Sequence, residues 1–371
     1  MRVELTDEQQ FLQEAVAGTV AREASLTAVR EWAQNSDHGQ ADALAARQGW
    51  TGIGLDEEHG GQGGGLVELA VVAEQLGAAA VPWDRTLAGC LAGPLLASTG
   101  TELGAELALQ TAEGSHVSIL CVDGGRPPAA LPEAAIADGH AGVEATYVLG
   151  AAAADELILP VDDGDEIALF AVSVTASGVL VRPRVIVDRT RSLAAVSLDD
   201  APVRTVGAVA RAAFRAAAAR AAVLTAADAL GAAGTLLALT TAYVADRRQF
   251  SVPVGSFQAV KHAAAEMLVD VEASRSAVQY AAWAVDAQSA DAIVQASIAK
   301  AYACAAAARV ADKALFLHGA IGYTWEHDLQ FLFKRAKSDL QLFGSPDRHL
   351  DLIAAHLPLL PVGERTPQPV G

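Results

Sequence analysis

The feature that most constrains the fold is a series of long alanine-rich helical patterns from residue 207 to about 356. These patterns are interrupted near residues 248–256 and 319–326, and the stretch 221–241 is apolar on nearly every face. A helix that is apolar all round is buried. The C-terminal part is therefore predicted to form a four-helix bundle that packs further against other subunits.

The middle of the chain has the pattern of strands. Short apolar runs are separated by Asp and Gly residues, for example at 162–165 (DDGD). Because no helical pattern lies between these runs, they indicate an antiparallel sheet or a small barrel. The predicted strands are 117–122, 156–161, 167–172, 179–181, 185–187 and 194–198.

The N-terminal part is predicted to be helical. Thr6 and Gln9 have the spacing of a capping box, and helical patterns follow at 39–48, 66–78 and 84–98. The predicted fold is therefore α+β, with three domains and a loose proline-rich tail. These are an N-terminal helical domain (1–114), a middle antiparallel β domain (115–206), a C-terminal four-helix bundle (207–357) and the tail (358–371).

Composition excludes several classes of partner. The formal charge of −18 argues against nucleic acid and against an anionic membrane surface. No long, strongly apolar stretch predicts a membrane span, and residues 1–25 lack the apolar core of a signal peptide. Three widely spaced cysteines (Cys90, Cys121 and Cys304) indicate a reduced, cytoplasmic protein without a disulfide framework or metal site.

The most informative motif is residues 246–262 (DRRQFSVPVGSFQAVKH). Arg247 has the fork geometry that grips a diphosphate, Phe250 offers a flat apolar face, and the Gln258 amide both donates and accepts. The spacing alone also suits an ordinary helix-turn-helix with solvated arginines. The whole string, however, closely resembles the helical-domain signature R-x-Q-F-G-x-P-I-G-x-F-Q-A-x-K-H of the acyl-CoA dehydrogenase family.

Two further blocks strengthen this resemblance. Residues 318–329 (HGAIGYTWEHDL) are similar to the family's H-G-G-x-G-Y-T-x-E-H-x-L segment. Residues 57–63 (EEHGGQG) and 74–77 (EQLG) are similar to its N-terminal loop and the helix that follows. The resemblance covers nearly the whole chain and implies the same order of helices, β domain and helical bundle.

The resemblance implies an enzyme that desaturates acyl-CoA thioesters between the α and β carbons. In this family a carboxylate removes the α proton, the β hydrogen leaves as hydride to FAD, and electrons pass to an electron-transfer flavoprotein. The residues that match the FAD-binding positions of the family are Arg247, Phe250, Gln258, Gly319, Gly322, Ser345 and Tyr147. In the family, the first three serve the FAD of a neighbouring subunit.

Several positions depart from the family pattern. Phe316 replaces a glutamine, Ala320 and Ser251 replace glycines, and Leu149 replaces a threonine that donates a hydrogen bond to the flavin. In the middle domain, residues 121–128 (CVDGGRPP) stand where the family has T-E-P-x-x-G-S-D.

The largest departure concerns the catalytic base. Most members place a glutamate directly before a Gly-Thr pair, where this chain has Phe343. A minority place it on the preceding bundle helix, where this chain has Ala221. Neither side chain accepts a proton.

One carboxylate, Asp228, lies about two turns from Ala221 on nearly the same helix face. An isolated carboxylate in an apolar helix is either paired or functional. Asp228 is therefore a candidate base or a buried partner of an arginine such as Arg220 or Arg247. Residues 326–328 (EHD) are also acidic or basic, but a helix-cap or turn role is favoured for them.

Three hypotheses remain open from the sequence. The first is one half of an α2β2 acyl-CoA dehydrogenase, resembling actinobacterial steroid side-chain enzymes, whose partner subunit carries the base. The second is a flavin-free structural or regulatory paralogue. The third is a self-sufficient homotetramer in which Asp228 is the base.

Overall fold

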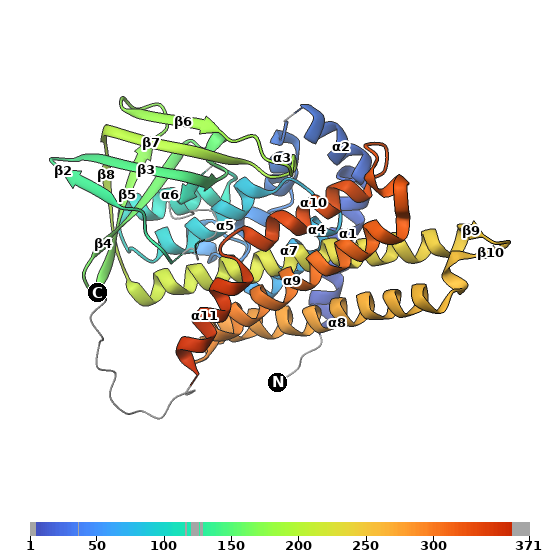
Figure 1. Ribbon diagram of the computed structural model, residues 1–371. Coiled ribbons are helices and arrows are strands. Elements are labelled where there is room, and N and C mark those ends of the chain that lie inside the picture. Colours follow the sequence, from blue (N-terminus) through green and yellow to red (C-terminus); the bar gives the residue numbers. More distant parts are fainter. Residues whose placement is uncertain (1–4, 36, 116, 120–125, 127–128, 358–371) are drawn as a thin grey trace, which may run out of the picture.

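The computed structural model describes residues 5–35, 37–115, 117–119, 126 and 129–357, and it confirms the predicted α+β fold (Figure 1). Along the chain, the N-terminal helices come first, the strands of two sheets follow, and long helices form the C-terminal part. The N-terminal helices are α1 (Asp7–Glu23), α2 (Leu26–Asn35), α3 (Gly39–Arg47), α4 (Leu66–Ala78), α5 (Asp84–Ala97) and α6 (Glu102–Ala112).

The N-terminal helices begin where local chemistry favours a helix start. The predicted capping box is confirmed, because the Gln9 backbone N–H donates to Thr6 Oγ1 (3.3 Å) and the Thr6 backbone N–H donates to Gln9 Oε1 (3.0 Å). The first turn of α4 is capped from a distant helix, since Asp286 accepts from the Leu66 and Val67 backbone N–H groups. The three helices predicted at 39–48, 66–78 and 84–98 are confirmed as α3, α4 and α5.

The middle region contains two four-stranded sheets in the orders β1-β4-β5-β8 and β2-β3-β7-β6. All strand pairs in these sheets are antiparallel except β1 with β4. The strands are β1 (Val117–Ile119), β2 (Ala134–Ala137), β3 (His140–Leu149), β4 (Glu156–Asp163), β5 (Glu166–Ser173), β6 (Val179–Pro183), β7 (Leu193–Pro202) and β8 (Arg204–Ala210).

Two sequence expectations in this region need comment. The strand predicted at 185–187 is wrong: these residues form a loop between β6 and β7, with Val185 86% and Val187 77% exposed. An apolar run has the composition of a strand, but here it has no neighbouring strand to bond to. Of the segment 121–128, only Arg126 belongs to the described residues.

The C-terminal bundle consists of α7 (Arg211–Asp246), α8 (Gln258–Asp286), α9 (Ala292–His318), α10 (Leu329–Gln341) and α11 (Pro346–His356). Helix α7 lies at its centre (Figure 1). By length and composition alone α7 could cross a membrane, but 72% of its most apolar window is buried inside the protein, as expected of a core helix. Helix α4 crosses α7 so closely that a Cβ on Gly77 or Gly231 would overlap the facing backbone.

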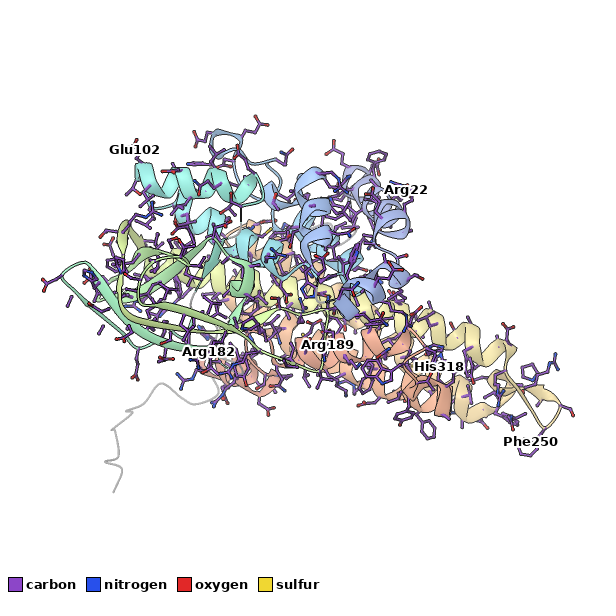
Figure 2. The ribbon with its side chains drawn as sticks, turned by 90° about the horizontal axis from the view of Figure 1, so that it is seen from above. Arg22, Glu102, Arg182, Arg189, Phe250 and His318 are labelled. Carbon is purple, nitrogen blue, oxygen red and sulfur yellow. The ribbon has the colours of Figure 1, made fainter. Side chains whose placement is uncertain are left out.

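One end of the bundle projects beyond the rest of the molecule. There α7 and α8 are joined by the short hairpin of β9 (Arg248–Gln249) and β10 (Val252–Pro253), followed by the 3₁₀ turn η4 (Val254–Ser256). Figures 1 and 2 show this hairpin at the far end from the two sheets. We call residues 247–258 the tip.

Candidate functional site

The structure brings the first three predicted cofactor residues together at the tip. Arg247 ends α7, Gln258 begins α8, and Phe250 lies in the turn between β9 and β10. All three are exposed, and Phe250 is 90% exposed. Figure 2 shows Phe250 at the end of the hairpin. The tip therefore places an exposed aromatic ring next to an exposed arginine and an exposed amide.

The turn at the tip explains why the family has a glycine after the phenylalanine. Phe250 and Ser251 occupy the two central positions of the hairpin, with φ of +51° and +68°. Positive φ at both positions is the type I′ pattern that favours glycine or asparagine. Ser251 therefore adopts a backbone conformation that costs an ordinary residue free energy.

The two predicted glycines lie in the 3₁₀ turn η5 (Gly319–Tyr323) after α9. Gly319 has a φ of +64°, and a Cβ there would meet nothing within 4 Å, so its surface is open to a ligand. Gly322 is buried, and a Cβ there would lie 3.1 Å from the His318 Cβ. Packing within the chain is therefore sufficient to explain Gly322.

Tyr147 and Ser345 lie away from the tip. Tyr147, on β3, is 37% exposed and lines a cavity of about 510 Å³ between the β domain and α10, with Phe333, Lys334 and Leu342. Ser345 is the N-cap residue of α11 and makes no side-chain capping bond. In one copy of the chain these residues and the tip residues are on separate parts of the molecule.

Both base positions of the family are filled by apolar side chains. Phe343 is 1% exposed and Ala221 is fully buried. Phe343 has a φ of +58°, which is strained for an aromatic residue. Hydrogen bonds hold the strained loop: the His349 ring bonds to the Phe343 carbonyl (3.0 Å), and the Lys300 ammonium donates to the Gly344 carbonyl (2.9 Å).

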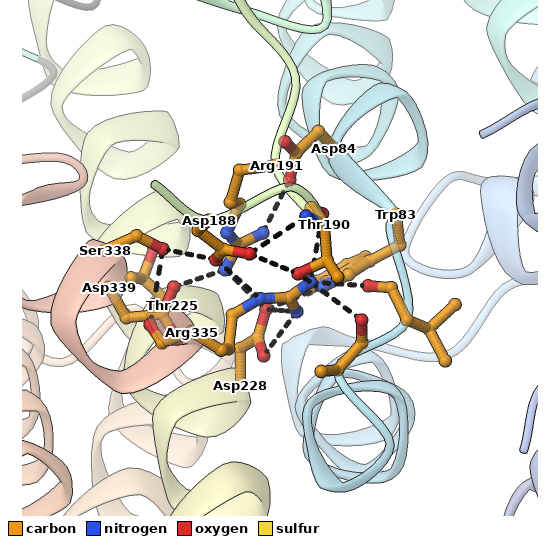
Figure 3. Close-up of polar contacts among 12 residues, drawn as sticks. Trp83, Asp84, Asp188, Thr190, Arg191, Thr225, Asp228, Arg335, Ser338 and Asp339 are labelled. Carbon is orange, nitrogen blue, oxygen red and sulfur yellow. Dashed lines mark hydrogen bonds and ion pairs between the residues drawn. The ribbon is translucent and has the colours of Figure 1, made fainter. Parts of the chain in front are cut away.

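Asp228 is the third candidate base, and the structure places it in a buried ion-pair network (Figure 3). Its carboxylate accepts from the Trp83 indole N–H (2.7 Å), from Arg191 (2.6 Å) and from Arg335 (3.1 Å). It is 0% exposed. The arginine-partner alternative is therefore the one that the geometry supports, although the partners are Arg191 and Arg335.

The network joins all three regions of the chain, and we call it the junction cluster. Its arginines come from the β6–β7 loop and α10, and its carboxylates come from α5, that same loop, α7 and α10. Arg335 also donates to the carbonyls of Ala80, Val81 and Thr190 at 2.9–3.0 Å. The charged members are Asp84, Asp188, Arg191, Asp228, Arg335 and Asp339.

The junction cluster contains four carboxylates and two guanidiniums, and the pKa values of two of the carboxyl groups move in opposite directions. Burial raises the pKa of Asp339 to about 7, although the Arg191 guanidinium opposes the shift and the Asp228 charge adds to it. Burial would also raise the pKa of Asp188, but Arg335 and Arg191 hold that pKa below its usual value. The Asp339 carboxyl group therefore takes up a proton near neutral pH.

A second cavity is lined by residues of α7, α9 and α11. It has a volume of about 400 Å³, and its apolar wall includes Ala222, the neighbour of Ala221 on α7. His349, which bonds to the Phe343 carbonyl, forms part of another wall. Arg211 and Arg215 add positive charge to the lining. A cavity with an apolar wall and cationic groups suits a ligand that combines an apolar part with an anionic group.

The EHD segment at 326–328 has the structural role expected from the sequence. The His327 Nδ1 atom accepts from the Leu329 backbone N–H (3.2 Å) at the start of α10. Asp328 pairs with Arg30 (2.5 Å). These contacts leave the segment in a capping and turn role.

Comparison with known proteins gives the family. The model of the acyl-CoA dehydrogenase N-terminal domain matches residues 6–109, and the model of the C-terminal domain matches residues 209–357. Acyl-CoA dehydrogenase IpdE2 of Mycobacterium tuberculosis is 36% identical over 92% of this chain and 94% of that protein. The chain belongs to the acyl-CoA dehydrogenase family.

Other relatives agree. IpdE2 of Mycolicibacterium smegmatis is 33% identical over 95% of this dehydrogenase and 100% of that protein. The structure of the ChsE4–ChsE5 complex of Mycobacterium tuberculosis superposes with a TM-score of 0.85 and 25% identity, covering 97% of this chain and 100% of that one. The resemblance stated from the motifs is thereby confirmed, and the activity is that of an acyl-CoA dehydrogenase, an oxidoreductase.

Proposed function

We propose that this dehydrogenase is one subunit type of an FAD-dependent α2β2 acyl-CoA dehydrogenase, and that the other subunit type carries the catalytic base. One observation carries the proposal: Phe343 and Ala221 occupy both base positions, and the nearby Asp228 is engaged by two arginines. Proton removal at the α carbon requires a carboxylate within hydrogen-bond reach. A subunit without a free carboxylate at these positions depends on a partner subunit for proton removal.

The remaining residues fit FAD. The exposed tip supplies an arginine for the diphosphate, an aromatic ring and an amide, and Gly319 leaves open space for close approach. Tyr147 and Ser345 lie elsewhere on the chain, so the two sets serve different cofactor molecules in an assembly. When bound, FAD supplies the acceptor for the β hydrogen of the substrate.

The substrate is an acyl-CoA thioester. Small side chains on α7, such as Ala218, Ala219 and Ala222, leave room for a bulky acyl group, and a steroid-derived one follows from the resemblance. Electrons then pass to an electron-transfer flavoprotein in the cytoplasm.

The visible spectrum of the purified chain tests this proposal. The chain is expressed alone and then together with a second dehydrogenase-like chain encoded beside it. A colourless chain that becomes yellow only with the partner, at one FAD per pair, is the expected result. Mass determination of the yellow complex then gives the subunit ratio.

Two other results would reject the proposal. Flavin absorbance in the chain alone, near one FAD per subunit, would favour a self-sufficient homotetramer in which Asp228 is the candidate base. A chain that stays colourless under both conditions would favour a flavin-free, non-catalytic paralogue.

A further inference from the structure

The end of β6 and the loop that follows it carry basic side chains that no acidic side chain neutralises. Arg182, Arg184 and Arg189 are all exposed. Among the described residues, no carboxylate lies within ion-pair distance of any of the three. The other charged residues of this segment, Asp188 and Arg191, are buried in the junction cluster. Every exposed charge over residues 182–191 is therefore positive.

A fourth basic side chain joins these arginines from α10. Lys334 lines a cavity of about 220 Å³ together with Arg189. Its ammonium donates to Gln330 Oε1 (2.8 Å) and lies 4.1 Å from the centre of the Trp325 ring, but no described carboxylate is within ion-pair distance of it. Burial lowers the pKa of Lys334, and the charge of Arg189 adds to this effect while that of Asp188 opposes it. Because like charges that share a cavity repel each other, an anionic group placed against them would be stabilising. The four side chains that we call the basic surface are Arg182, Arg184, Arg189 and Lys334.

The sign of the basic surface is opposite to that of the whole chain. The chain has 44 acidic and 26 basic residues and a formal charge of −18. Elsewhere an exposed basic group finds an acidic neighbour, as where Arg47 Nη2 lies 2.9 Å from Glu23 Oε2. Figure 2 shows Arg182 and Arg189 on the same face of the molecule. A local positive field of this kind attracts an acidic macromolecule and orients it.

Exposed apolar side chains lie among the basic ones. Val185 is 86% exposed and Val187 is 77% exposed. Val187 lines the cavity of about 510 Å³ together with Tyr147, and the Arg184 Cζ atom lies 5.8 Å from the centre of the Tyr147 ring. Apolar side chains surrounded by charged ones are the composition of a protein interface. A small anion would neutralise the arginines but would leave both valines uncovered.

We propose that the basic surface, with Val185 and Val187, is the docking surface for the protein that accepts electrons from this dehydrogenase, and that it binds an acidic face of that protein. This inference rests on the proposed function, because it takes Tyr147 as a residue of the flavin site. The acceptor has to approach the flavin, and the basic surface borders the cavity that Tyr147 lines. It adds no chemical step to the reaction.

Exposed charges suit a partner that has to bind and leave in every turnover. Long-range attraction between opposite charges speeds the encounter of two proteins and sets their orientation. Exposed ion pairs contribute little to the affinity of the final complex, so they do not slow its dissociation much. The apolar contact of Val185 and Val187 is small, which also fits a short-lived complex.

The test measures how tightly the enzyme binds its acceptor protein in the absence of substrate. The probe is the electron-transfer flavoprotein encoded in the same genome, and the full chain is used in the assembly in which it purifies. Surface plasmon resonance gives the affinity at about 50 mM and about 300 mM salt. The variants are Arg182→Glu and Arg189→Glu, and the control is Arg22→Glu on α1, which changes the net charge equally on another part of the molecule (Figure 2).

We expect Arg182→Glu and Arg189→Glu each to weaken the affinity by about tenfold or more at the lower salt concentration. At the higher concentration the loss should fall below about threefold, because salt screens exposed charges. Arg22→Glu should stay within about twofold of the unchanged protein. A fourth variant, Val185→Ser, should weaken binding by about threefold at both salt concentrations, because salt does not screen an apolar contact.

Unchanged affinity in both Arg182→Glu and Arg189→Glu would overturn the proposal. An equal loss in Arg22→Glu would overturn it as well, because only the net charge would then matter. The subunit mass and the flavin absorbance of the two variants are also measured. A changed mass would assign the surface to contacts between subunits, and a loss of FAD would assign it to the cofactor, and either result would reject docking of the acceptor.

Turnover with an uncharged quinone as electron acceptor separates this inference from the proposed function. We expect this turnover to be unchanged in Arg182→Glu and Arg189→Glu. An assembly that reduces the quinone but does not bind the acceptor protein would reject the docking surface and leave the proposed function standing. An assembly that does not reduce the quinone, yet binds the acceptor protein with the expected dependence on both arginines, would reject the proposed function and leave the docking surface standing.

Discussion

The junction cluster and the tip both present arginines, but they differ in how their charges are satisfied. Arg335 and Arg191 are at most 5% exposed, and each has carboxylate partners from other regions of the same chain. Arg247 at the tip is exposed and has no side-chain partner among the described residues. The difference separates arginines that hold the regions of this chain together from an arginine that is free to bind a ligand or a partner.

The largest effect should come from breaking the junction cluster. We expect Arg335→Met to lower the free energy of unfolding by about 3–5 kcal/mol, because it leaves the four buried carboxylates with Arg191 as their one remaining guanidinium. Chemical denaturation measures this loss. The control is Arg47→Met, which removes an exposed pair with Glu23 and should cost less than about 1 kcal/mol. Equal effects of the two variants would show that the cluster does not stabilise the fold.

The role of Asp228 can be separated from that of a base. We expect Asp228→Asn to lower the free energy of unfolding by roughly 2–3 kcal/mol, since Arg191 and Arg335 lose a charged partner. Turnover per folded, assembled enzyme should change by less than about twofold, matching the control Asp84→Asn. A loss of about a hundredfold or more in Asp228→Asn alone would make this carboxylate the base.

The same comparison shows what the sequence could and could not reveal. The tip was predictable because its arginine, ring and amide lie within one short string, and the fold class followed from long helical patterns. The lone charge of Asp228 in an apolar helix indicated that this carboxylate has a partner, but it did not indicate which residue the partner is. Its partners are 37 and 107 residues away, a separation that local patterns do not span.

The loop before α11 was only half predictable. The sequence placed Phe343 at the base position, but nothing in it indicated that the ring of His349 would bond to the Phe343 carbonyl. The strand prediction at 185–187 was wrong because the composition of these residues is that of a strand, but a strand forms only where a second strand lies alongside to pair with it.

At the tip, we expect function to change while stability does not. Arg247→Ala should alter the free energy of unfolding by less than about 0.5 kcal/mol. It should weaken FAD binding in the assembled enzyme by about tenfold or more, because a charge-assisted bond to the diphosphate is lost. Flavin titration measures this affinity.

The neighbouring Arg248 provides the matched control. Its guanidinium donates to the Ser251 carbonyl (3.4 Å) within the hairpin, so Arg248→Ala should leave the FAD affinity within about twofold. Equal losses in the two variants would mean that general positive charge, and not the position of Arg247, attracts the cofactor.

The junction cluster should also make stability depend on pH. The raised pKa of Asp339, about 7, means that the folded state holds a proton that the unfolded state releases above its ordinary value of 3.8. Stability from this group is therefore greatest at low pH and is lost as the pH rises through about 7.

Asp339→Asn should remove this dependence. As the pH is raised from 5 to 8, the free energy of unfolding of the variant should rise by roughly 1–3 kcal/mol relative to that of the unchanged protein. Taking the difference is essential, because the lowered pKa of His349 acts with the opposite sign between about 4 and 6.5. A constant difference across this range would show that Asp339 does not carry the proton.

The smallest effect concerns the backbone of the tip. Ser251 has a φ of +68°, so Ser251→Gly should raise the free energy of unfolding of the isolated chain by about 0.5–1 kcal/mol. In contrast, Ser256→Gly should lower it by a similar amount, because the Ser256 hydroxyl donates to the Pro253 carbonyl (2.7 Å). Ser251→Gly could instead weaken FAD binding in the assembly without stabilising the chain. That result would mean that Ser251 contacts the partner subunit, and that this contact outweighs the backbone strain at the tip.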